Sequence, residues 1–100
     1  NVHFSDSGIE IQLEEVSFSI QIDITLDNND DYLVLYLNDD KEIASQTIPG
    51  LNRNDGLTRY TLAIPPHASQ GGFDKIKIYP QHGDGSYTIG HLLLSETGQQ

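Results

Sequence analysis

A cluster of oxygen-bearing side chains, D-N-N-D-D at residues 27–31, is the densest candidate for metal chemistry in this sequence. Asp27, Asn29 and Asp31 have the i, i+2, i+4 spacing with which the calcium-binding loop of an EF-hand begins. The match then ends, because the sixth position of the loop is Tyr32 instead of glycine and the twelfth is Asn38 instead of glutamate. The sequence therefore favours a solvated turn here, with a calcium site of another geometry as the alternative.

Aromatic and polar side chains supply the candidates for ligand binding. An exposed phenol ring can stack on a sugar or anchor a protein partner, although tyrosine is also a common half-buried strand residue. Arginine can donate paired hydrogen bonds to a carboxylate or to sugar hydroxyls. On these grounds we predict six ligand-binding residues, namely Tyr36, Arg59, Tyr79, Asp84, Tyr87 and His91.

The sequence predicts no enzyme activity within these 100 residues. It contains no cysteine and no G-x-S-x-G motif that would present a nucleophilic serine. The four histidines, His3, His67, His82 and His91, lack the H-x-H or H-x-x-x-H spacing of a zinc site. A tight turn explains the two glycines around Asp84 without a catalytic role.

An acidic charge balance limits the partners of the chain. Its 15 Asp and Glu residues against 5 Lys and Arg give a net charge of −10 with neutral histidines. Such a field repels phosphates and anionic membrane surfaces, so we expect no nucleic-acid binding. A neutral ligand, a cation or a basic protein remains compatible with this charge. No apolar run approaches the ~20 residues of a membrane span, so we expect no membrane insertion within this segment.

The elements that must position these side chains are strands. From Val16 to Leu26 every second residue is apolar, which predicts one long strand with one side facing the core and the other facing the solvent. The run 32–37 is apolar on both faces and predicts a central strand covered on both sides. Further short strands are predicted at residues 2–4, 9–13, 42–48, 59–64, 73–79 and 86–94. No window has helical periodicity, and residues 67–72 are predicted to form a loop.

Seven or eight short strands separated by turns predict an all-β fold, an antiparallel two-sheet β-sandwich. We expect a jelly-roll-like topology, with an immunoglobulin-like one as the alternative. The chain has the size of one domain, covering residues 1–100. It begins with Asn1 and contains no methionine, so we expect a processed chain or a piece excised from a longer protein.

Three segments in the second half resemble a known group of proteins. They are R-Y-T-L-A-I-P, G-F-D-K-I-K-I-Y-P and H-G-D-G-S-Y-T-I-G-H-L-L-L, between residues 59 and 94. Their order resembles the small jelly-roll, carbohydrate-binding-like accessory domains of bacterial envelope transferases. This resemblance implies a non-catalytic module in the periplasm, on the cell surface or secreted, which helps a larger enzyme hold a glycan.

Two functions therefore compete at the level of sequence. The first is a binding module that contacts a carbohydrate through exposed tyrosines and polar loop residues. The second is a structural or protein-interaction domain of a multidomain surface protein, with a neighbouring protein domain as its partner. A contiguous exposed apolar patch would favour the second function over the first.

Overall fold

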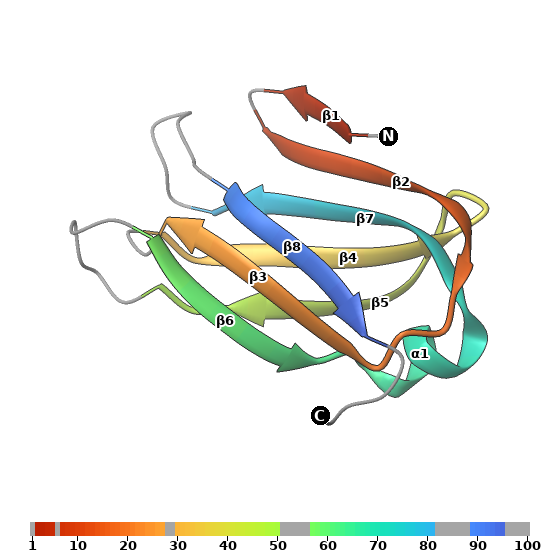
Figure 1. Ribbon diagram of the computed structural model, residues 1–100. Helices are drawn as coiled ribbons and strands as arrows, with labels where there is room; N and C mark the ends of the chain where they lie inside the picture. Colours follow the sequence, from red (N-terminus) through yellow and green to blue (C-terminus); the bar gives the residue numbers. More distant parts are fainter. Residues whose placement is uncertain (1, 6, 28–29, 51–56, 82–88, 96–100) are drawn as a thin grey trace.

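The computed structural model describes residues 2–5, 7–27, 30–50, 57–81 and 89–95, which form two facing antiparallel sheets (Figure 1). The five-stranded sheet has the order β1 (Val2–Ser5), β2 (Gly8–Ser17), β7 (Phe73–Pro80), β4 (Tyr32–Asn38) and β5 (Lys41–Ile48). The three-stranded sheet has the order β6 (Leu57–Ala63), β3 (Gln21–Asp27) and β8 (Ile89–Ser95). The predicted all-β sandwich is confirmed, and the jelly-roll-like topology stays a prediction.

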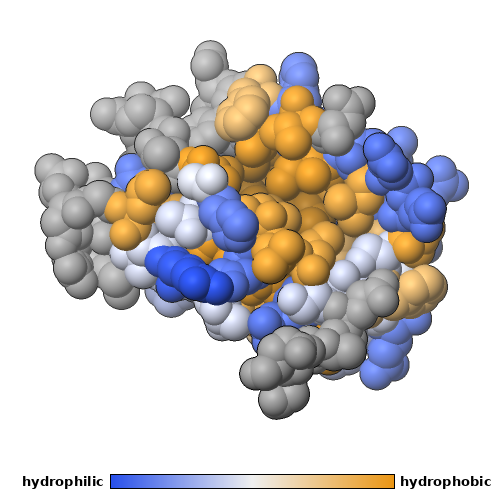
Figure 2. Space-filling model, in the orientation of Figure 1, coloured by the Kyte–Doolittle hydropathy of each residue, from blue (hydrophilic) through white to orange (hydrophobic). Residues whose placement is uncertain are grey.

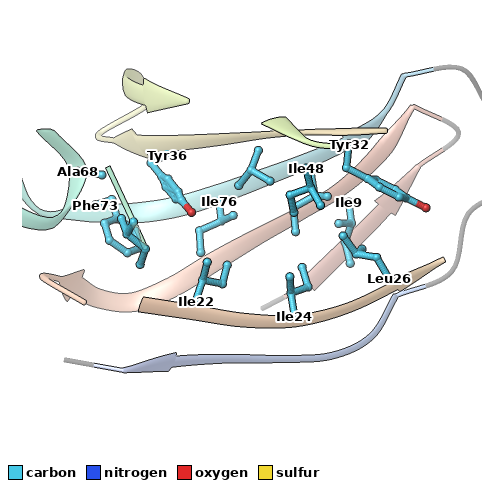
Figure 3. Close-up of a cluster of buried hydrophobic side chains, with 13 residues drawn as sticks. Ile9, Ile22, Ile24, Leu26, Tyr32, Tyr36, Ile48, Ala68, Phe73 and Ile76 are labelled. Carbon is cyan, nitrogen blue, oxygen red and sulfur yellow. The ribbon is translucent and has the colours of Figure 1, made fainter. Parts of the chain in front are cut away.

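The core lies between the two sheets and is made by alternate residues of their strands. The three-stranded sheet contributes Ile22, Ile24 and Leu26 of β3, each of which is almost fully buried. The facing side chains come from the other sheet and from α1 (Pro66–Gly71) (Figure 3). They are Ile9, Tyr32, Val34, Tyr36, Ile48, Ala68, Phe73, Ile76 and Ile78.

A two-residue hairpin turn joins β4 to β5. Asn38 pairs with Lys41, and the two residues between them have positive φ angles, 54° at Asp39 and 66° at Asp40. Two consecutive positive φ angles define a type I′ turn, whose twist matches that of the flanking strands. Aspartate tolerates this conformation better than most residues because its short side chain can bond to nearby backbone.

The prediction of one continuous strand over residues 16–26 is wrong. β2 ends at Ser17 in one sheet and β3 begins at Gln21 in the other, so the chain crosses between the sheets at residues 18–20. The Ser17 hydroxyl accepts a hydrogen bond from the Ser19 amide at 3.1 Å and lies 2.6 Å from the Ser19 hydroxyl. This local bonding offers the backbone an alternative to the ladder, which is how serine interrupts strands.

The crossing also overturns the expected burial of three apolar residues. Val16, Phe18 and Ile20 are 45%, 52% and 41% exposed, although their alternation continues that of the buried Ile22 and Ile24. Alternation assigns residues to one face only while the strand is unbroken. Val16, Phe18 and Ile20 therefore lie outside the buried core, whereas Ile9, earlier in β2, is part of it.

The expected loop at residues 67–72 contains a six-residue helix, α1. Pro66 occupies its first turn, where a proline ring presets the helical φ angle and the missing N–H is not needed. Ala68 is buried, and Gly72 ends the helix with a φ angle of 87°. Fewer than two turns cannot establish a helical period, so the sequence pattern did not reveal this element.

β4 is fully covered on its inner face and only partly on its outer face, where Leu37 is 6% exposed, so the prediction of a strand covered on both sides holds in part. Val34 and Tyr36 are buried in the core, whereas Leu33 and Leu35 on the outer face are half-buried. Their neighbours there on β7 are Tyr79 and Lys77. The long stems of such side chains shield apolar surface, so an outer leucine does not require a covering layer.

Candidate functional site

A charged pair lies on the outer face of the three-stranded sheet. The Arg59 guanidinium donates from Nε to Asp23 Oδ1 at 2.8 Å and from Nη2 to Asp23 Oδ2 at 2.5 Å. The Asp23 side chain is 8% exposed and that of Arg59 is 71% exposed. The paired bonds fix the plane of the guanidinium, and its remaining N–H donors face the solvent.

His91 lies beside this pair, immediately after a bulge in β8. Thr25 of β3 is opposite both Arg59 on β6 and His91 on β8, so Arg59 and His91 flank β3 on the same face. The register shifts between Thr25 and Leu26, where Gly90 is the extra residue. A Cβ atom at Gly90 would lie 3.2 Å from Leu57 Cδ1 and 3.3 Å from Thr25 Cγ2, so glycine permits the close approach.

The pair perturbs the acidity of both of its members. The hydrogen bond from Arg59 holds the pKa of the Asp23 carboxyl below its ordinary value of 3.8, and the charge of His91 adds to this effect. Burial of Asp23 acts in the opposite direction and is outweighed. The same hydrogen bond raises the pKa of Arg59. The carboxylate is therefore ionised and satisfied, and it is not a free base for catalysis.

The lowered pKa of Asp23 predicts a contribution to acid stability. The folded pKa is below the unfolded value, so the stabilisation is complete above about pH 4 and is lost as the pH falls through the folded pKa. Asp23→Asn is expected to flatten the decline in the free energy of unfolding between about pH 5 and about pH 2, measured by urea denaturation. Arg59→Gln, which keeps the carboxyl but removes its partner, should flatten the same decline. Wild-type slopes in both variants would contradict this account.

Asp23 is the residue of this cluster that the sequence-based selection missed. Its signal was present, because aspartate is uncommon within strands and Asp23 is the one charged residue in residues 20–26. The pairing itself could not be found from sequence, since 36 residues separate Asp23 from Arg59.

The prediction that Tyr36 is a ligand-binding residue is wrong. Its side chain is fully buried, its ring contacts that of Phe73 edge-on, and its hydroxyl donates to Gln46 Oε1 at 2.5 Å. Burial raises the pKa of the Tyr36 hydroxyl far above its ordinary value of 10.0. The ring is therefore part of the core and has no face on which a sugar could stack.

The remaining candidates that the structure describes do not gather at one place. Tyr79 lies on the outer face of the five-stranded sheet, where it covers the backbone of Gly8. Arg59 and His91 lie on the outer face of the opposite sheet, so the sandwich separates them from Tyr79. The predicted sites at Asp84 and Tyr87 fall outside the described residues.

The predicted calcium ligands have other partners where they are described. Asp31 Oδ1 accepts a hydrogen bond from the Gly50 amide at 2.6 Å, and the Asp31 carbonyl accepts one from the Gln81 amide at 2.9 Å. Asp27 is the last residue of β3, and Asn29 lies outside the described residues. Within the described ranges, no three His, Asp or Glu side chains are grouped closely enough to hold a metal ion.

A second polar cluster lies on the outer face of the five-stranded sheet. An open pocket of about 310 Å³ is lined by Val2, His3, Glu10, Gln12 and Lys75. Lys75 Nζ contacts Glu10 Oε2 at 3.1 Å and Asp40 Oδ1 at 2.6 Å, and these bonds raise the pKa of Lys75. The ammonium group is thus shared between two carboxylates, which indicates a role in joining β2, β7 and the hairpin turn.

The two sides of the sandwich are closed to different degrees. On one side the Gln46 amide of β5 donates to the Ala63 carbonyl of β6 at 3.1 Å, so the edges of the two sheets are joined. On the other side β8 is the last strand of its sheet among the described residues, while β2 and β1 extend beyond it (Figure 1). The five-stranded sheet has two more strands than its partner, a difference of roughly 10 Å in width.

The part of the five-stranded sheet that extends beyond β8 leaves inward-facing apolar side chains uncovered. Register places Val2 opposite Ile11 and Phe4 opposite Ile9, on the same face as the buried Ile76. Val2 and Phe4 are nevertheless 51% and 63% exposed. Figure 2 shows a broad hydrophobic area on this face, in the region where Figure 1 has β2 beyond β8.

An open groove of about 420 Å³ continues this surface between β2 and the end of β8. Its apolar walls include Leu13 of β2 and Leu94 of β8, and its charged residues are Glu14 and Glu15. Ser17, Ser19 and Val16 complete the lining. We call this groove, together with Val2, Phe4 and Ile11, the open edge. The sequence could not indicate it, because it arises from the unequal widths of the sheets.

Comparisons with family models, with curated proteins and with solved structures find no match to this chain. The resemblance to accessory domains of envelope transferases and the extracytoplasmic location that it implies therefore stay predictions. Among the described residues, the structure contains no helix that is both long enough and apolar enough to cross a membrane.

Proposed function

We propose that this chain is a non-catalytic interaction module that binds another protein, or a neighbouring domain, at the open edge. The observation that carries this proposal is the exposure of Val2 and Phe4 on the core-facing side of their sheet. Removing apolar surface from water is favourable by about 25 cal/mol per Å², so a partner that covers these side chains gains binding energy there. Contiguous apolar surface on a small domain commonly marks such a site.

Carbohydrate binding has less support in the arrangement of side chains. Sugar recognition needs aromatic and polar groups that converge on one surface. Of the six predicted residues, Arg59 and His91 share a face, Tyr79 is on the opposite one and Tyr36 is buried. The protein-interaction alternative is therefore the one we advance.

Selection of displayed random peptides of about 12 residues against the whole chain tests the proposal. We expect binders that lose affinity by about tenfold or more with Phe4→Ser, since Phe4 is exposed and its replacement leaves the core intact. The matched control is Leu57→Ser, because Leu57 is 50% exposed on the outer face of the other sheet. The proposal would be overturned if no peptide were selected, or if the selected peptides bound Phe4→Ser with unchanged affinity. Binding of a polysaccharide with NMR shifts at Arg59 and His91 instead would favour the glycan function.

A further inference from the structure

We infer that the ligand of the open edge is an extended segment that adds to β8 as a further strand and carries basic residues at its N-terminal end. This inference rests on the proposed function and specifies the partner's conformation and charge. It follows from three observations, namely the unpaired backbone of β8, the space in front of β2 and the acidic residues at one end of the groove.

The first property is the backbone of β8. β3 pairs with one side of β8 over residues 89–95, and among the described residues no strand pairs with the other side. An edge strand presents a row of N–H and C=O groups that an incoming strand can bond. β8 also has no proline to interrupt such a ladder, since its sequence is I-G-H-L-L-L-S.

The second property is the space in front of β2. A strand added to β8 would lie about 4.8 Å further along the sheet, over the inner faces of β2 and β1. Its inward side chains would then meet Ile11 and Leu13, which are half-buried, and reach toward Phe4. Side chains alternate across a strand, so every second residue of the segment should be apolar.

The third property is the charge at one end. Glu14 and Glu15 line the groove next to Leu94, and no basic residue lines that groove. An antiparallel strand would place its N-terminal end beside Leu94, since this residue is near the C-terminal end of β8. Basic residues at that end would face the two glutamates, and the net charge of −10 on the chain adds to the attraction.

A second copy of this chain fits these properties less well. The edge strands of its two sheets are β1, β5, β6 and β8, and β1 and β8 contain no lysine or arginine. β5 and β6 offer one such residue each, but Lys41 is followed by Glu42 and Arg59 is already paired with Asp23. Each copy would also bring its own charge of −10 to the interface. Like charges at close range oppose association, so we assign the edge to a different protein.

Synthetic peptides of about nine residues test this inference directly. The probe has two lysines followed by alternating valine and threonine, and the controls place the lysines at the C-terminal end or replace them with glutamates. We expect the first peptide to bind the whole chain by isothermal calorimetry about tenfold or more tightly than either control. We also expect it to slow hydrogen exchange at β8 amides between Leu92 and Ser95, which strand pairing protects.

A charge reversal in the protein supplies the matched variant. Glu14→Lys with Glu15→Lys should invert the preference, so that the glutamate peptide binds more tightly than the lysine peptide. Both side chains are exposed, so the fold should be retained, and circular dichroism verifies it. An unchanged preference, or binding without protection of β8, would overturn the inference. Analytical ultracentrifugation would also overturn the inference if it showed that the chain forms a dimer and that dimer formation excludes the peptide. The open edge would then be the binding site of a second copy.

These outcomes separate the inference from the proposed function. If selected peptides depend on Phe4 but bind as helices, or without regard to Glu14 and Glu15, the protein-binding function stands and strand addition fails. If no peptide depends on Phe4, the proposed function itself fails.

Discussion

Phe73→Ala is expected to lower the free energy of unfolding by about 3–5 kcal/mol, the usual cost of removing a buried phenylalanine. Phe73 is fully buried at the start of β7, and its ring centroid lies 5.2 Å from that of Tyr36 at an interplanar angle of 79°. Alanine would forfeit both the transfer energy of the ring and this edge-to-face contact, and would leave a cavity. Urea denaturation measures the loss as a lower transition midpoint.

Phe18→Ala is the matched control for this prediction. Phe18 is 52% exposed at the crossing between the sheets, so the same substitution should change the free energy of unfolding by less than about 1 kcal/mol. A domain of this size has about 5–15 kcal/mol of stability, so the two variants should be easy to distinguish. Equal losses would contradict the placement of Phe18 outside the core and of Phe73 within it.

Gly8→Ala is expected to destabilise the fold by about 1–3 kcal/mol, because an added methyl group has no room. A Cβ atom at Gly8 would clash with the Ile78 carbonyl oxygen and lie 2.5 Å from Tyr79 Cδ1. The first of these atoms belongs to the backbone of β7 and cannot rotate away. Relief of the clash would require β2 to separate from β7 at its first pair, and chemical denaturation measures the cost.

Gly71→Ala is the matched control for the glycine substitution. Gly71 is the last residue of α1, and a Cβ atom there would meet no atom within 4 Å. Alanine has the higher helix propensity, so we expect an unchanged or slightly raised stability. A Gly8→Ala variant as stable as Gly71→Ala would show that the start of β2 tolerates a side chain and would contradict the described packing.

Much of the fold could be predicted from local pattern. Alternation at residues 22–26 identifies the inner face of β3, and the acidic residues between β4 and β5 identify their hairpin. Prolines and glycines after residues 48 and 63 mark the ends of β5 and β6. These features depend on neighbours within a few residues, which is why a single sequence reveals them.

Less of the candidate site could be predicted from local sequence pattern. Tyr36 and Tyr79 differ in burial because β4 and β7 present them to opposite faces of one sheet. Arg59 can be chosen from the sequence as a polar candidate, but its partner Asp23 depends on the pairing of β6 with β3. Long-range register decides which outward groups meet, and no local signal encodes it.

The sequence by itself determined that this chain builds strands with one apolar face, separated by turns, and that it carries a net charge of −10, which opposes binding to phosphates. Tertiary structure alone decided that the alternation of residues 16–26 is divided between two sheets, so that Ile22 and Ile24 are buried while Val16 and Phe18 are not. It also decided that β1 and β2 extend beyond β8 and leave an apolar edge open. The physical reason is that period-two patterning specifies which side of a strand is apolar, whereas burial depends on how many strands the opposing sheet provides.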